Sequence, residues 1–271
     1  MGRRSLRKCL WSAETDPGVL LSVSVVVIIP ARLGSTRLPG KALADIGGKP
    51  MVVRVLERAR MASGVERVLV ATDDRGIAEA VANAGGEARM TAAEHPSGTD
   101  RIAEVARDLD ADIVVNVQGD LPFLEPDYVE AAIGALEQGS ERSDGIVIGT
   151  LATPLVEGEM EKSQVVKVVC DREDRALYFS RSPIPSGTDE GLRHIGLYSY
   201  RREFLLELAK MEPTALEKQE RLEQLRVLEN GYGIRVARVE AKESMIEVDT
   251  PEDLERVRRW MTGRQGSSGR E

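Results

Sequence analysis

The chain contains 271 residues, of which 42% are hydrophobic and 30% are charged. This length is enough to bury one substantial core, so one main domain is expected. Its 37 Lys and Arg residues against 45 Asp and Glu residues leave a net charge of −8, which argues against nucleic acid held by overall charge. An anionic ligand would therefore need a local cluster of cations.

The cysteines and the apolar runs argue for a cytoplasmic protein without a membrane partner. Cys9 and Cys170 are far apart and have no second Cys or His at metal-ligand spacing. Neither a disulfide framework nor a structural zinc site is therefore predicted, and a reducing compartment fits best. The apolar run at 19–29 is too short to cross a membrane as a helix.

The domain is expected to span residues 23–262, after an N-terminal extension at 1–22 and before a flexible tail at 263–271. Val23–Ile29 is a continuous β-branched run, which is typical of a strand covered on both faces of a parallel sheet. The elements predicted next are a helix opening at Pro50, a strand at 65–71, helices at 77–84 and 101–109, and a strand at 113–117. This βαβαβ order predicts parallel strands with ligands at their carboxyl ends.

The second half of the chain changes character after a predicted helix at 127–136. Four strand-like segments follow with Pro and Gly between them, at 146–151, 165–170, 176–180 and 194–200, and they are expected to form an inserted β-rich subregion. The chain then returns to helices at 201–210 and 216–228, a strand at 234–240 and a last helix at 251–261. The whole pattern predicts an α/β domain.

The loop after the first strand has the composition of a phosphate-binding segment. Residues 30–41 (PARLGSTRLPGK) contain two prolines, two glycines, three cations and no acid. Small residues let backbone N–H groups approach a phosphate, and Arg32, Arg37 and Lys41 can neutralise it. The spacing matches neither a Walker A loop nor the Gly-x-Gly-x-x-Gly of dinucleotide binders. The alternative is an ordinary solvated loop.

Two carboxylates are candidate Mg²⁺ ligands. Asp120 follows the strand at 113–117, where an open α/β sheet places catalytic groups, and Asp249 stands just before the last helix. Two carboxylates plus substrate phosphates are a common way to hold Mg²⁺. The alternatives are a turn-forming Asp120 and a helix-capping Asp249.

Three further segments are open to a structural explanation. His95–Arg101 (HPSGTDR) has helix-capping residues, although the same N–H groups can hold a nucleobase or a phosphate. His194 is a single histidine in an apolar strand, where a structural role is more common. Leu216–Arg226 (LEKQERLEQLR) on its own predicts an amphipathic helix with its charges facing water.

Taken in this order, the segments resemble the CMP-Kdo synthetases, the 3-deoxy-manno-octulosonate cytidylyltransferases of bacterial lipopolysaccharide synthesis. The match runs from about Val25 to Met261. Its motifs are Pro-Ala-Arg-x-x-Ser-Thr-Arg-Leu-Pro-x-Lys (30–41), His-x-Ser-Gly-Thr-Asp-Arg (95–101), Val-Asn-Val-Gln-Gly-Asp (115–120), Tyr-Phe-Ser-Arg (178–181), His-Ile-Gly-x-Tyr-x-Tyr-Arg (194–201), Leu-Glu-Gln-Leu-Arg (222–226) and Val-Asp-Thr-Pro-Glu-Asp-Leu (248–254).

This resemblance implies a three-layer, Rossmann-like nucleotidyltransferase fold with a mostly parallel sheet, a homodimer, CTP as co-substrate and Mg²⁺ as cofactor. Arg32, Arg37 and Lys41 would meet the CTP phosphates, and Asp120 and Asp249 would hold Mg²⁺. The residues implied to place nucleotide or sugar are Ser97, Gly98, Arg101 and Gln118. Those implied to line the sugar side are Arg181, His194, Tyr198, Glu223 and Gln224.

The implied reaction is attack of the anomeric C2 hydroxyl of the ulosonic acid on the α-phosphorus of CTP. Pyrophosphate leaves while Mg²⁺ and Lys41 stabilise its charge, and no covalent enzyme intermediate is needed. The acidic sugar also needs a cation, which Arg181 can supply as a bidentate partner.

One residue departs from the family pattern. The family usually reads Gln-Gly-Asp-Glu-Pro, whereas this chain has Leu121 in place of the Glu. A related nonulosonic or amino-substituted octulosonic acid is therefore an alternative substrate.

Two other functions remain as alternatives. One is a nucleotidyltransferase for a sugar 1-phosphate or sialic acid, which the His194 and Leu222–Arg226 segments disfavour, and the other is a nucleotide-binding regulatory homologue without turnover. The joint presence of Arg32, Lys41 and the two aspartates argues against the last.

Overall fold

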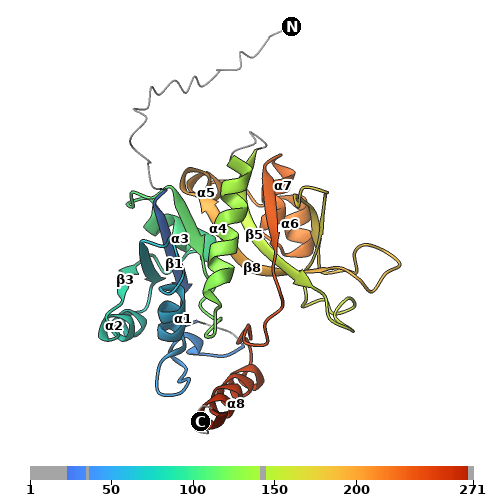
Figure 1. Cartoon of the computed structure of the whole chain (residues 1–271). Helices are drawn as coiled ribbons and strands as arrows, with labels where there is room; N and C mark the ends of the chain where they lie inside the picture. Colours follow the sequence, from blue (N-terminus) through green and yellow to red (C-terminus); the bar gives the residue numbers. More distant parts are fainter. Residues whose placement is uncertain (1–22, 35–36, 141–144, 268–271) are drawn as a thin grey trace.

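The computed structural model describes residues 23–34, 37–140 and 145–267 (Figure 1). The predicted extension at 1–22 and residues 268–271 of the predicted tail lie outside this described part. Within it, no helix combines the length and the apolar character that crossing a bilayer would require.

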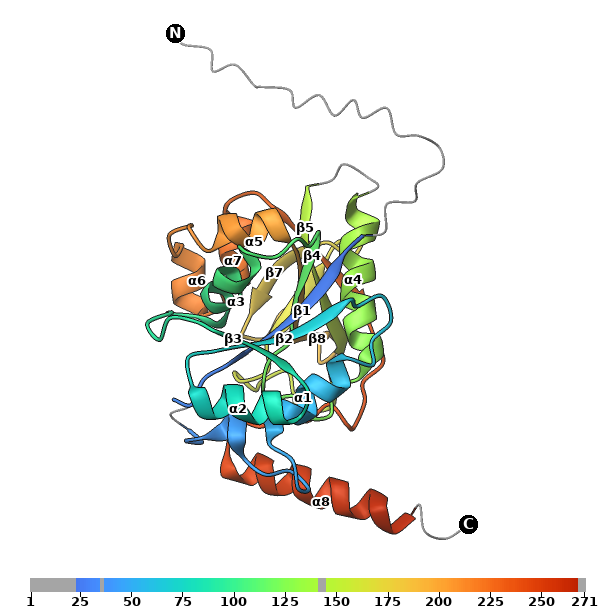
Figure 2. The same ribbon diagram turned by 90° about the vertical axis from the view of Figure 1, so that its left-hand side faces the viewer.

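A mixed sheet forms the middle layer of the domain, and its central strand β1 (Val25–Ala31) explains the layering. Alternate side chains of β1 point to opposite faces, so that Val27 packs in one apolar cluster and Ile28 in another. The first cluster lies under α1 (Met51–Ala59), α2 (Arg75–Asn83) and α4 (Pro126–Ser140). The second lies under α3 (Gly98–Ala106), α5 (Arg202–Leu208) and α7 (Gln224–Glu229). Helices therefore cover both faces (Figure 2).

The main path of the sheet has the order β3-β2-β1-β4-β8-β5-β9. Six of these seven strands run in one direction and β8 alone runs against them. The fold is thus the predicted three-layer α/β arrangement with a mostly parallel sheet. The bounds are β2 (Arg67–Thr72), β3 (Glu87–Met90), β4 (Ile113–Asn116), β5 (Ile146–Pro154), β8 (Leu192–Arg201) and β9 (Gly233–Arg238).

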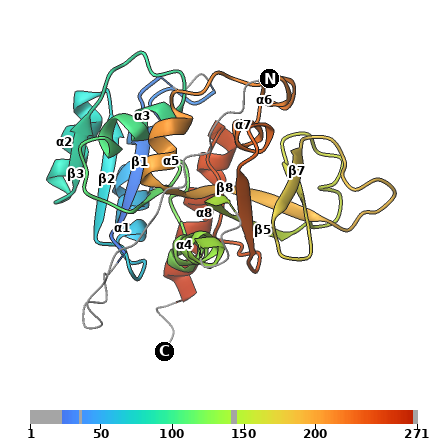
Figure 3. The ribbon, with the colours of Figure 1, turned by 90° about the horizontal axis from the view of Figure 1, so that it is seen from above.

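The expected β-rich insertion is smaller than the sequence suggested. Strands β5 and β8 belong to the main path, and only β6 (Lys167–Cys170) and β7 (Ala176–Ser180) lie off it. Strand β6 pairs with β8, so the β6–β7 hairpin extends one end of the sheet and projects beside it (Figure 3). The strand β3 was not predicted, because it is a partly exposed strand without a clear apolar alternation.

Two helix predictions need correction. The predicted helix at 216–228 is two helices, α6 (Ala215–Glu220) and α7, because Arg221 adopts a left-handed conformation with φ of 55°. The carboxylate of Glu220 accepts hydrogen bonds from Ser180 Oγ at 2.7 Å and Arg181 N at 2.9 Å, which fastens the end of α6 to β7. The last helix, α8 (Pro251–Ser267), continues past its predicted end at residue 261, since glycine only weakens a helix without necessarily ending it.

Candidate active site

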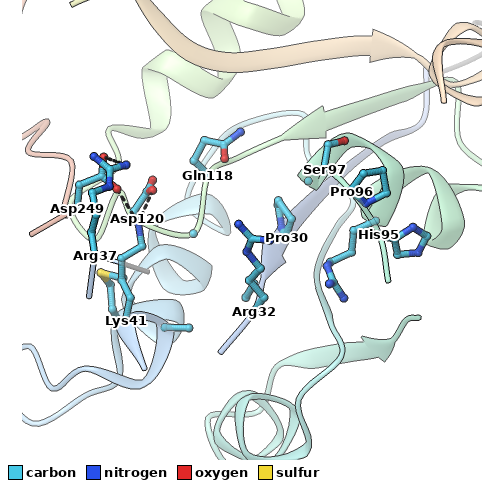
Figure 4. A pocket seen from close by; sticks show the side chains of 16 residues that line it. Pro30, Arg32, Arg37, Lys41, His95, Pro96, Ser97, Gln118, Asp120 and Asp249 are labelled. Carbon is cyan, nitrogen blue, oxygen red and sulfur yellow. Dashed lines mark hydrogen bonds and ion pairs between the residues drawn. The ribbon is translucent and has the colours of Figure 1, made fainter. Parts of the chain in front are cut away.

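A cavity of about 310 Å³ lies at the carboxyl ends of β1 and β4. This is the edge where a parallel sheet presents its loops and helix N-termini to a ligand. Its lining brings together all the residues predicted to meet the nucleotide and the metal (Figure 4). These lining residues are Arg32, Arg37, Lys41, Ser97, Gly98, Arg101, Gln118, Asp120 and Asp249.

A glycine lets the segment after β4 reach this cavity. A Cβ atom placed on Gly119 would lie 3.0 Å from the carbonyl oxygen of Pro30, closer than most real Cβ contacts. The absence of a side chain therefore allows the backbone that carries Gln118 and Asp120 to run directly beside the end of β1.

Lys41 connects the two predicted metal ligands. It opens the 3₁₀ helix η1 (Lys41–Leu43), and its Nζ lies 2.8 Å from Asp120 Oδ2 and 3.0 Å from Asp249 Oδ1 (Figure 4). Burial would lower the pKa of Lys41, but the charges and hydrogen bonds of both aspartates raise it above its ordinary value. Arg37 Nη2 adds a second cation, 3.0 Å from Asp249 Oδ2.

A backbone hydrogen bond joins the segments that carry Asp120 and Asp249. The N–H of Val248 donates to the carbonyl oxygen of Asp120 over 3.0 Å. Burial raises the pKa of Asp120 against the opposing effect of Lys41. Its Oδ1 is buried and has no hydrogen-bond partner within the described residues. A buried carboxylate oxygen of this kind is suited to bind a cation.

The geometry argues against a helix-capping role for Asp249. Helix α8 is capped by Thr250, whose Oγ1 accepts from Asp253 N at 3.2 Å, while Asp253 Oδ2 accepts from Thr250 N at 3.0 Å. This reciprocal arrangement satisfies the helix N-terminus without the Asp249 carboxylate. Asp249 instead directs both of its oxygens at Lys41 and Arg37.

The sequence analysis missed Glu247 as a third carboxylate of this group. Asp120, Glu247 and Asp249 each offer an oxygen, and these atoms all lie within 4.8 Å of one another. Desolvation, together with the charges of Asp120 and Asp249, raises the pKa of Glu247 to about 7. The available signal was the alternation of Ile246 and Val248, both buried, with the two carboxylates Glu247 and Asp249.

The N-terminus of α3 forms the opposite wall of the cavity. Ser97 is the N-cap, and its side chain accepts from the backbone N–H of Asp100, so the capping interpretation holds while the residue also lines the cavity. Arg101 is 3% exposed and its Nη1 lies 3.4 Å from Asp73 Oδ1. The side chain of Arg101 is therefore fixed in place beside the cavity.

A second, smaller cavity of about 120 Å³ shares Gln118 and Asp120 with the first. Its wall includes Leu121, which is 8% exposed, in the position where the family motif carries Glu. Two cations that were not predicted, Arg193 and Lys242, also line it. Their positions in a strand and a loop gave no motif by which sequence reasoning could select them.

His194 lines this second cavity as a neutral side chain. Burial lowers its pKa to about 3. Thr150 Oγ1 lies 2.9 Å from His194 Nε2 and donates its only proton to a backbone carbonyl, that of Leu197 at 2.8 Å. His194 Nε2 must then donate to Thr150, which leaves Nδ1 as an acceptor. Tyr198, whose pKa burial raises, packs against the ring at a centroid distance of 5.4 Å.

The other predicted sugar-side residues are spread over neighbouring positions. Glu223 accepts a hydrogen bond from Thr99 Oγ1 near the larger cavity, and burial raises its pKa. Gln224 is buried, and its Nε2 has no hydrogen-bond partner in the described part of the chain. Arg181 lines neither cavity, since its guanidinium donates to the carbonyl oxygens of Glu220 at 3.0 Å and Ser163 at 3.2 Å.

The charges predicted to face water on the segment 216–226 are in part buried. Arg226 is 8% exposed and binds both oxygens of Glu217, with Nε 2.8 Å from Oε2. This bidentate pair joins α6 to α7 across the break at Arg221 and positions Glu223 at the start of α7.

Comparison with known proteins agrees with this geometry. A family model described as cytidylyltransferase matches residues 26–243. A curated protein of Geotalea uraniireducens, named 3-deoxy-manno-octulosonate cytidylyltransferase, is 51% identical over 251 residues, which cover 87% of this chain and 98% of that protein. A protein of Syntrophotalea carbinolica with the same name is 49% identical over 255 residues, 89% of this chain and 100% of its own length.

Solved structures show the same relationship. The chain superimposes with a TM-score of 0.82 and 43% identity on a structure described as CMP:2-keto-3-deoxy-manno-octonic acid synthetase complexed with CTP, covering 89% of this chain and 99% of that one. A 4-diphosphocytidyl-2C-methyl-D-erythritol synthase from Anaerococcus prevotii shares the fold at 14% identity with a TM-score of 0.58, covering 89% of this chain and 99% of that one. The chain therefore belongs to the cytidylyltransferase family and, within it, to the CMP-Kdo synthetases.

Proposed function

We propose that this protein joins CTP and 3-deoxy-manno-octulosonate to give CMP-Kdo and pyrophosphate, for lipopolysaccharide synthesis. The observation that carries the proposal is that two cavities share Gln118 and Asp120. The first is lined by cations suited to bind phosphates, and the second is smaller and is lined by both polar and apolar side chains. The name shared by relatives of about 50% identity supplies the substrate class.

In the proposed reaction the larger cavity binds CTP. Arg32, Arg37 and Lys41 meet the triphosphate, and the N–H groups at Ser97 and Gly98 offer further donors at the start of α3. The C2 hydroxyl of the sugar then attacks the α-phosphorus, its proton passes to solvent, and the bond to the pyrophosphate oxygen breaks. Cations fixed before the reaction stabilise the charge that develops on the leaving pyrophosphate.

The carboxylate group fits a divalent cation. Asp120, Glu247 and Asp249 supply hard oxygen ligands, and the unpartnered Oδ1 of Asp120 offers a ligand atom that is already desolvated. These three residues would hold Mg²⁺, which when bound would supply positive charge at the phosphates.

The acidic sugar would bind in the smaller cavity. Arg193 lies there with Nη1 2.9 Å from Glu159 Oε1, and a guanidinium has further donors for the sugar carboxylate. The neutral His194 offers Nδ1 as an acceptor for a hydroxyl. Arg193 is thus a second candidate beside Arg181 for the carboxylate-binding cation.

The experiment that tests the function measures pyrophosphate release with CTP and Mg²⁺ across a panel of ulosonic acids, sialic acid and sugar 1-phosphates. Turnover with 3-deoxy-manno-octulosonate alone, or far above the rest, supports the proposal. Release with a sugar 1-phosphate, or CTP binding without any release, would replace it with one of the alternatives.

A related ulosonic acid is the second candidate because Leu121 makes part of the sugar-side wall apolar. The same panel separates it from the first by the ratio of kcat/KM values. The homodimer and the cytoplasmic location that the resemblance implies are also proposals, and sedimentation equilibrium and cell fractionation test them.

A further inference from the structure

The carboxylate group formed by Asp120, Glu247 and Asp249 already contains a cation that belongs to the chain. Lys41 Nζ contacts one oxygen of Asp120 at 2.8 Å and one of Asp249 at 3.0 Å. The side chain of Lys41 is 17% exposed and that of Asp120 is 16% exposed. The ammonium therefore compensates charge in a largely dehydrated position, where an uncompensated carboxylate would be costly.

The carboxylates that hold the ammonium are also those that a divalent cation would use. Asp120, Glu247 and Asp249 each offer an oxygen within 4.8 Å of the others, and the ammonium of Lys41 is hydrogen-bonded to two of these three side chains. A divalent ion bound to Asp120 and Asp249 would take over the electrostatic role of Lys41 at a short distance from the ammonium. Two cations with a combined charge of +3 so close together would repel each other strongly.

We propose that Lys41 and the divalent cation are alternative occupants of this carboxylate group, and that Lys41 leaves it only when the nucleotide triphosphate offers another anion. The identity of that anion rests on the proposed function. Lys41 also lines the 310 Å³ cavity (Figure 4). The long flexible stem of a lysine allows its ammonium to turn from the carboxylates to the phosphates without movement of the backbone.

If so, binding of the divalent cation and binding of the nucleotide are coupled. Without nucleotide the metal must displace an internal ammonium, so metal alone binds weakly. With nucleotide present the ammonium has a new partner, so metal binds more tightly, and by linkage the metal increases nucleotide affinity by the same factor. Arg37 also contacts Asp249, but its side chain is 66% exposed and competes less.

The test measures binding of Mn²⁺ alone, without nucleotide or sugar, by calorimetry and by the electron paramagnetic resonance signal of free Mn²⁺. The variant Lys41→Met keeps the apolar stem and removes the ammonium. We expect it to bind Mn²⁺ at least about 10-fold more tightly than the unmodified chain, the factor that about 1.4 kcal/mol of relieved competition gives. The control is Lys49→Met, which removes an exposed lysine paired with Glu57 and should leave Mn²⁺ affinity unchanged.

A measurement at high ionic strength distinguishes displacement of the Lys41 ammonium by the metal from long-range repulsion between the two cations. A screened effect of the Lys41 charge would disappear in about 0.5 M KCl, where the Debye length is only a few ångströms. An effect that comes from occupation of the same carboxylates would persist. Equal or weaker Mn²⁺ binding by Lys41→Met, or a gain that vanishes in high salt, would overturn the proposal.

A second measurement uses the unmodified chain and does not depend on how the variant folds. A CTP analogue with a non-cleavable α–β bridge should increase the Mn²⁺ affinity of the unmodified chain, and by a larger factor than in Lys41→Met when both fold. An analogue that leaves Mn²⁺ affinity of the unmodified chain unchanged would contradict the exchange. Because sugar is absent, a failed pyrophosphate assay would count against the proposed function alone.

Discussion

The backbone N–H of Val248 donates to the carbonyl oxygen of Asp120, and this single 3.0 Å hydrogen bond aligns two segments that are distant in sequence. It sets Asp120 beside Glu247 and Asp249, and it does so through main-chain atoms. Side-chain substitutions in the carboxylate group should therefore change its charge without separating the segments.

For this reason Asp120→Asn and Asp249→Asn should each reduce turnover at least about 100-fold while leaving the fold intact, because metal charge stabilisation is worth several kcal/mol. The double variant should be little worse than either single variant, since one lost ligand already misplaces the cation. Steady-state kinetics at saturating Mg²⁺, with circular dichroism as the folding control, provides the measurement. Losses that simply multiply would mean that the two aspartates act independently.

Lys41→Ala should lower kcat roughly 100-fold, with a smaller rise in the KM for CTP. The reason is that its charge matters most as pyrophosphate separates, and removal of one such donor typically costs about this factor. Initial rates at varied CTP separate the two constants. A change confined to KM would assign Lys41 to ground-state binding.

Arg193→Ala and Arg181→Ala distinguish two candidate positions for the sugar carboxylate. Arg193→Ala should raise the sugar KM about 30-fold with little change for CTP, as expected when the cationic partner of the sugar carboxylate is lost. Arg181 donates to the carbonyl oxygens of Glu220 and Ser163, so its removal should mainly lower the melting temperature. Steady-state kinetics and thermal unfolding of both variants distinguish the two positions. A raised sugar KM in Arg181→Ala, with only a lowered melting temperature in Arg193→Ala, would place the sugar carboxylate at Arg181.

His194 should make stability fall as the pH is lowered. Its pKa is lowered to about 3 in the folded chain, whereas the unfolded chain binds the proton near the ordinary pKa of about 6.5. The unfolded state therefore takes up more protons between these values, and the free energy of unfolding falls as pH drops below about 6.5.

The variant His194→Gln removes this titration. At pH 4.5 it should retain about 2–3 kcal/mol of the stability that the unmodified chain loses relative to pH 7.5. Urea unfolding at the two pH values measures the difference. If the variant and the unmodified chain lost equal stability between the two pH values, the pKa of His194 would not be lowered by folding.

Prediction from sequence succeeded where local chemistry and periodicity agree. The β-branched run predicts the buried strand β1 without tertiary information, and the cation-rich loop after it lines the larger cavity. Asp120 and Asp249 could be selected because each stands where a strand ends or a helix begins.

The features that were missed depend on tertiary contacts. The helix break at Arg221 comes directly after Glu220, which is hydrogen-bonded to the end of β7, and the buried pair of Arg226 with Glu217 looks like surface charge in the sequence. Arg193 became a candidate only when pairing of β8 with β5 placed it beside the second cavity.

Asp249 follows the last strand of the described sheet in the chain, immediately before α8. Chains are synthesised from the N-terminus, and the earlier parts of a protein can begin to fold while the later parts are still being made. All nine strands thus precede Asp249 and emerge before it, whereas the carboxylate group is complete only when the segment 247–249 has emerged and paired with Asp120. A nascent chain with a formed sheet would therefore still lack two of the three carboxylates of this group.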